Sequence, residues 1–75
     1  QAGEALWQAT LERTRKTIAR KLPPFPDEAA MVAHLARRLR QDEAALQAAF
    51  RPSSRPDAER FTQAICMLEL VRRSL

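Results

Sequence analysis

A chain of 75 residues forms one domain at most, and at this size only about 60–65% of the unfolded surface can be buried. A single glycine, no tyrosine, and abundant alanine, leucine, glutamate, arginine and glutamine indicate an all-helical protein, while the lone Cys66 excludes an internal disulfide and favours a reducing, intracellular setting. The net charge of +4 permits contact with acidic partners, but no apolar run is long enough to cross a membrane.

The first predicted helix covers residues 3–22. Large or branched residues recur every three or four positions along one side of it: Trp7, Leu11, Thr14, Ile18 and Leu22. Arg13, Lys16 and Arg20 fall on the opposite side. The helix must end at Leu22, because Pro23 disfavours helical geometry in the residue before it and supplies no N–H.

A proline-rich corner follows, with the sequence PPFP at residues 23–26. We expect a rigid turn in which Phe25 packs on the core. The alternative is a polyproline ligand for an aromatic-lined groove, which needs an exposed segment. A four-residue connection between helices is a poor candidate for that role.

The second predicted helix covers residues 27–50. Asp27 can accept bonds from the N–H groups of its first turn, and Glu28 favours the positive helix end. Polar Asp42 and Glu43 fall on the core side, which is a local conflict. Either the helix frays or bends there, or it has passed the edge of its partner, or Asp42 caps a separate short helix over residues 43–50.

The third predicted helix covers residues 56–74. Ser54 and Asp57 resemble a capping box, with Pro56 in the first turn. The main apolar stripe is Phe61, Ala64, Ile65, Leu68, Val71 and Leu75, and it is widened by Cys66, Met67 and Leu70. A helix this apolar either lies between two others or leaves a face for a partner.

Three helices with short connections predict one compact, all-α, three-helix bundle over residues 1–75. Because the chain begins at Gln1, we expect it to be a fragment of a larger protein. We expect no catalytic residue, no metal and no cofactor. There is no glycine-rich phosphate loop, and one histidine and one cysteine cannot build a zinc site alone. His34 is expected to be solvated, and Cys66 to be a buried, inert thiol.

The basic residues raise the possibility of nucleic-acid binding. They fall into three groups along the chain: Arg13, Lys16 and Arg20; Arg37, Arg38 and Arg40; Arg72 and Arg73. No aromatic residue interleaves them for base stacking, and the corner is no helix-turn-helix turn. Nucleic acid is therefore a less favoured partner.

With these residues described, the sequence resembles a KIX domain, the three-helix coactivator module that docks activation-domain helices. Trp7 precedes TRKTIARKL at residues 14–22, similar to the first helix of that family. PFPDEAAM at residues 24–31 resembles its proline corner, although the corner here is a few residues shorter. From Pro26 to Leu75 the apolar positions follow the second and third helices of the family without a gap.

The resemblance implies two docking sites for amphipathic helices. The first, between the first and third helices, would use Thr14, Ile18, Lys21, Phe61, Ala64, Ile65 and Leu68. The second would use Leu22, Phe25, Leu39, Val71 and Leu75. Lys21, Arg72 and Arg73 would form a basic rim that attracts acidic helices. Glu69 stands where a well-known family member has a tyrosine that helps hold a phosphoserine, which puts phosphorylation-dependent binding in doubt.

The sequence therefore predicts a non-enzymatic interaction module that is monomeric in isolation, nuclear, and docked by activation domains or transcription machinery. One alternative is a KIX-like module inside a DNA helicase that contacts RNA polymerase II. Another is a helical bundle that dimerises or docks a different protein. A stable dimer would favour the bundle, and a steep salt dependence would favour nucleic-acid binding.

Overall fold

The computed structural model describes residues 2–51 and 57–75, and this part of the chain is all-helical. It contains α1 (Ala2–Lys21), α2 (Glu28–Leu39), α3 (Glu43–Phe50) and α4 (Ala58–Ser74), with no strand in the described ranges. The predicted all-α class is confirmed. None of the helices built from these residues is long and apolar enough to cross a membrane.

The proline corner ends α1 as the sequence predicts, within one residue. Leu22 still donates its N–H to the Ile18 carbonyl across 2.9 Å, and the chain then leaves the helix at Pro23. Phe25 is half-buried, packs against the core, and lies with its ring centroid 5.3 Å from that of His34. The corner is therefore a turn anchored by an aromatic side chain.

The second predicted helix, residues 27–50, is wrong as a single element. It begins as expected, because the Asp27 carboxylate accepts a 2.8 Å bond from the Ala30 N–H. It then stops at Leu39, and Arg40 takes the left-handed conformation with φ 56° and ψ 45°. The Ala36 carbonyl accepts the Arg40 N–H and also, across 3.0 Å, the Gln41 N–H, so both donors close the end of the helix on one acceptor.

A new helix starts immediately after this break. Asp42 is its N-cap, and its carboxylate accepts a 3.0 Å bond from the Ala45 N–H. The third of the sequence-based alternatives, a separate helix capped by Asp42, is the one the structure adopts. Asp42 would face the core in a continuous helix, whereas at an N-cap its carboxylate is solvated and bonded. The described residues thus form four helices.

The last helix begins at Ala58 and not at residue 56 as predicted. Asp57 is its N-cap, since the Asp57 carboxylate accepts a 2.9 Å bond from the Arg60 N–H, and it does not occupy the third helical position of a capping box. Of the predicted capping box, Ser54 lies outside the described residues, as does Pro56. The end of the helix at Ser74 agrees with the prediction.

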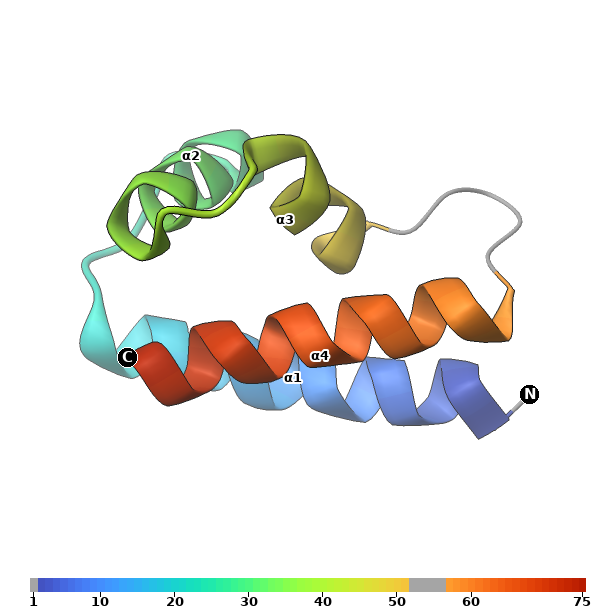
Figure 1. The fold of residues 1–75 in the computed structure, drawn as a ribbon. Coiled ribbons are helices and arrows are strands. Elements are labelled where there is room, and N and C mark those ends of the chain that lie inside the picture. Colours follow the sequence, from blue (N-terminus) through green and yellow to red (C-terminus); the bar gives the residue numbers. More distant parts are fainter. Residues whose placement is uncertain (1, 52–56) are drawn as a thin grey trace.

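The four helices form two layers (Figure 1). The long helices α1 and α4 lie side by side and run in the same direction, with α2 and α3 packed across them. The parallel direction is visible in the contacts. Trp7 and Phe61 have ring centroids 5.9 Å apart, and seven residues later in each helix the Thr14 hydroxyl lies 3.4 Å from the Leu68 carbonyl oxygen.

Small side chains of α1 allow α4 to come close. Thr10, Thr14 and Thr17 are buried, and each hydroxyl donates to the carbonyl four residues earlier in its own helix. A Cβ added at Gly3 would lie 3.4 Å from the Phe61 Cβ. The contact between α1 and α4 is therefore lined by residues whose polar groups are already satisfied.

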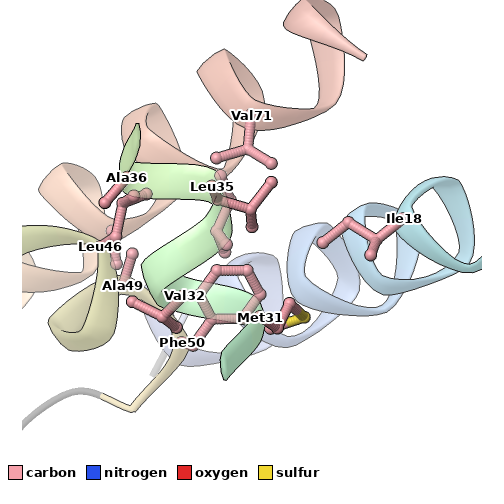
Figure 2. Close-up of a cluster of buried hydrophobic side chains, with 11 residues drawn as sticks. Ile18, Met31, Val32, Leu35, Ala36, Leu46, Ala49, Phe50 and Val71 are labelled. Atoms are coloured by element: carbon pink, nitrogen blue, oxygen red, sulfur yellow. The ribbon is translucent and has the colours of Figure 1, made fainter. Parts of the chain in front are cut away.

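The core lies between the two layers (Figure 2). Most of its largest fully buried side chains come from α2 and α3, namely Val32, Leu35, Leu46 and Phe50. They pack on the inner faces of α1 and α4, where α4 contributes Leu68 and Val71. A polar tie crosses the same boundary, because the Trp7 Nε1–H donates to the Ala49 carbonyl across 2.9 Å. This tie fixes the N-terminal half of α1 beneath α3.

Candidate functional site

The predicted partner-binding residues divide by burial into three groups. Six lie inside the protein, namely Thr14, Ile18, Phe61, Ala64, Leu68 and Val71. Six are half-buried, namely Leu22, Phe25, Leu39, Ile65, Arg72 and Leu75, while Lys21 and Arg73 are exposed. Their role toward a partner stays a prediction, but the six buried side chains hold the protein together and offer little free surface.

The first predicted site is filled by the protein's own packing. Five of its seven residues are buried where α1 and α4 meet each other and the core, leaving Ile65 half-buried and Lys21 exposed. In the second predicted site Val71 is buried, while Leu22, Phe25, Leu39 and Leu75 pack against the core from its edge. The open surface lies beside these residues.

One open hollow lies at the proline corner, and we call it the corner hollow. It measures about 430 Å³ and is lined by Arg15, Ile18, Ala19, Pro23, Pro24, Phe25, Asp27, Glu28 and Met31. Two of the predicted site residues, Ile18 and Phe25, are among these. The apolar members come from the end of α1, the corner and the start of α2, so the rigid turn gives the hollow its shape.

Charged residues bridge three helices at the edge of the corner hollow. Glu28 accepts from Arg15 of α1 and from Arg51 at the end of α3, each across 3.1 Å. Arg15 also stacks over Phe50, with its guanidinium carbon 5.4 Å from the ring centroid. Exposed ion pairs contribute little to stability, but a bridged carboxylate restricts how the arginines can turn toward a ligand.

A second open hollow lies between α1 and α4, and we call it the basic hollow. It measures about 640 Å³ and is lined by Arg13, Lys16, Thr17, Ala19, Arg20 and Arg72. Four of these six residues are cations. Sequence reasoning assigned three of them to a strip on the first helix and Arg72 to the rim of a groove. Because α1 and α4 run parallel, the structure brings all four to one place.

A third hollow lies between α3 and α4, and Ala64 is the one residue of its lining that the sequence analysis assigned to a docking site. It measures about 340 Å³ and is lined by Ala45, Ala48, Ala49, Arg60, Gln63, Ala64 and Met67. The alanines on the α3 side, Ala45, Ala48 and Ala49, carry no signal beyond helix propensity in the sequence. Only the break at Arg40, which turns α3 against α4, brings them opposite Met67.

Two expectations about reactive side chains are corrected. Cys66 is exposed, because it lies on the side of α4 away from the core. His34 is half-buried beside Phe25, and its buried Nε2 has no hydrogen-bond partner within the described part of the chain. Residues 2–51 and 57–75 contain no group of three His, Cys, Asp or Glu side chains that could hold a metal ion.

The corner hollow and the basic hollow adjoin, since Ala19 lines both of them. One offers mainly apolar side chains and the other mainly cations. This pair of hollows around the C-terminal half of α1 is the candidate site. No family model, no curated protein and no solved structure matches the chain. The case for a function accordingly comes from the residues and from this geometry.

Proposed function

We propose that the protein is a non-enzymatic interaction module that docks amphipathic helices of transcription-related proteins. The observation that carries the proposal is the adjacency of the two hollows at Ala19. An amphipathic helix has one apolar and one polar face, which is the pattern that a mainly apolar hollow beside a basic one can receive.

The apolar part of such a ligand would anchor in the corner hollow. Phe25 and Met31 supply large, adaptable side chains there, and the flanking prolines hold the walls in place. A preformed hollow favours binding, because little conformational entropy is lost when the ligand enters.

The charged part of the ligand would lie over the basic hollow. Arg13, Lys16 and Arg20 reach it from α1, and acidic side chains of a bound helix would pair with them. Such pairs near the rim mainly raise the association rate and set the orientation of the ligand, and they weaken with added salt.

The resemblance to the KIX family supplies the biological setting of the proposal. In that comparison α2 and α3 together take the place of the second helix of a three-helix bundle. Activation domains are the first ligand class to test, and a host that contacts RNA polymerase II is the alternative. Both place the module in the nucleus.

The test is an amide-resolved NMR titration with a short acidic amphipathic activation-domain peptide. We expect shifts at the non-proline residues between 13 and 31 that line the two hollows, and at Arg72. Arg20→Glu should weaken binding by about five-fold, because it removes a favourable surface ion pair and puts a like charge in its place. The matched control is Arg38→Glu, which makes the same charge change on an exposed residue of α2.

Two results would contradict the proposal. One is the absence of shifts at near-millimolar peptide. The other is equal weakening by Arg20→Glu and Arg38→Glu, which would show that net charge and not the site governs binding.

Nucleic-acid binding is a second candidate, favoured by the four cations around one hollow. Phosphate contacts release condensed counterions, so affinity for a duplex would fall steeply between low and physiological salt. A helix anchored in the corner hollow would lose much less affinity over the same range, because its apolar contacts are not screened.

A bundle that dimerises is a third candidate, favoured by the hollow between α3 and α4. Size-exclusion chromatography with light scattering decides it. A stable dimer at micromolar concentration would favour dimerisation over the docking of other helices.

A further inference from the structure

The basic hollow contains one cation that already has a partner. Arg72 donates through Nη2 to Glu69, which lies three residues earlier on α4. The two side chains are 37% and 29% exposed, so the pair is at the surface and open to competition. The other three cations, Arg13, Lys16 and Arg20, make no ion pair with any residue that the structure describes.

The pairing leaves Arg72 incompletely satisfied. Its Nε is buried and has no hydrogen-bond partner among the residues that the structure describes. A buried donor without an acceptor is unfavourable, so this guanidinium would gain a hydrogen bond by moving to a position where its Nε–H is bonded. A rearrangement that frees Arg72 from Glu69 therefore costs less than breaking a fully bonded pair.

We propose that Glu69 is an internal competitor for the basic hollow, occupying Arg72 in the free protein until a ligand carboxylate replaces it. The inference rests on the proposed function insofar as the ligand is an acidic helix. The exchange itself requires only a ligand that carries carboxylates. Glu69 thereby lowers the affinity for every acidic ligand, and it favours ligands that present several acidic groups at once.

The size of the effect follows from the kind of pair involved. Exposed ion pairs contribute little, so removing the competitor by Glu69→Gln should tighten acidic ligands by about 1.5- to 5-fold. Gln keeps the shape and the hydrogen-bonding capacity of the side chain without its charge. An unchanged circular dichroism spectrum and Tm would show that the fold is intact.

A matched control separates competition from a general change in charge. Glu12→Gln makes the same charge change on an exposed residue of α1 that has no ion pair within the described ranges. The second control is the background Arg72→Gln. If Glu69 acts through Arg72, Glu69→Gln should give no more gain in that background than Glu12→Gln gives.

The experiment uses isothermal titration calorimetry at low ionic strength with two probes. One is the acidic amphipathic peptide, and the other is a short oligoglutamate without an apolar face. We expect Glu69→Gln to tighten both probes relative to Glu12→Gln, and the gain to vanish in the Arg72→Gln background.

The outcomes distinguish this inference from the function on which it rests. If the amphipathic peptide binds and Glu69→Gln matches Glu12→Gln, the inference is overturned and helix docking stands. If the amphipathic peptide binds no better than oligoglutamate, helix docking is overturned, while a gain from Glu69→Gln on oligoglutamate still supports the internal competitor. If neither probe binds any variant, both are overturned.

Discussion

The two layers of the protein are built in different ways. The pair α1 and α4 meets through small residues, with the threonines Thr10, Thr14 and Thr17 buried along α1. The pair α2 and α3 instead contributes large apolar side chains, such as Leu35, which pack into the core. The first pair is close because the threonine side chains are small, and these can be buried because their hydroxyls donate to carbonyls of α1. The second pair is held by the burial of apolar surface.

The two layers contribute differently to stability and to the candidate site. Most of the large buried side chains belong to the α2–α3 layer and its contact with α4, so hydrophobic stabilisation is concentrated there. The candidate site surrounds the C-terminal half of α1, which carries Arg13 and Arg20 on its exposed side. Changes in the two layers should therefore have different effects.

The largest expected effect comes from emptying the α2–α3 layer. Phe50→Ala removes a ring that is 2% exposed, and it should lower the free energy of unfolding by about 3–5 kcal/mol. The control is Leu6→Ala on α1, where the side chain is 58% exposed and the change should stay within about 0.5 kcal/mol. Urea denaturation measures both. Similar losses for the two variants would contradict this division of the core.

A smaller effect should follow from crowding the α1–α4 contact. Thr14→Leu places a larger side chain against the Leu68 carbonyl, and overpacking of this kind costs about 1–3 kcal/mol. Thr14→Val keeps the volume and should stay within about 1 kcal/mol, because the Thr10 carbonyl still accepts its helical N–H bond. Thermal denaturation measures both variants. If Thr14→Val destabilises the protein as much as Thr14→Leu does, the hydrogen bonds of the hydroxyl matter more to this contact than the volume of the side chain.

The smallest effect concerns the break between α2 and α3. Arg40 holds a left-handed conformation that glycine adopts without strain, so Arg40→Gly should stabilise the protein by about 0.5–1 kcal/mol. Arg38→Gly, two residues earlier and still helical, should destabilise it by a similar amount. The same direction of change for both variants in thermal denaturation would argue against the break.

The helix ends were predictable because their signals are local. Pro23 and the cap at Asp27 each act within a few residues, so the sequence indicates them directly, whereas Asp57 was assigned to a capping box and is itself the cap. The break at Arg40 was harder, because an arginine carries no turn signal. The polar Asp42 indicated a conflict at that point. The sequence could not decide whether the helix frays or bends there, extends past the edge of its partner, or ends before a new helix.

The candidate site was less predictable because it depends on pairing between distant segments. Nothing in the spacing of Arg13 and Arg72 says that they share a hollow, since this needs α1 and α4 to run parallel. The same holds for burial. Periodicity placed Thr14 on the apolar stripe of its helix, and the structure buries it, while the groove role of Thr14 was implied by the KIX resemblance alone. Cys66 was expected to be buried because it lies in an apolar run, and the structure exposes it.

The parallel pair also has a consequence for how the chain folds. Thr14 and its contact on Leu68 are 54 residues apart, so forming this contact closes a long loop, which costs conformational entropy. Helical proteins whose helices pair with their sequence neighbours fold fastest, and distant pairing slows folding. During synthesis, α1 leaves the ribosome before the other three helices, and α4 leaves after them. Until then its threonine-lined side is without its final partner, and assistance from a chaperone would be most useful in that interval.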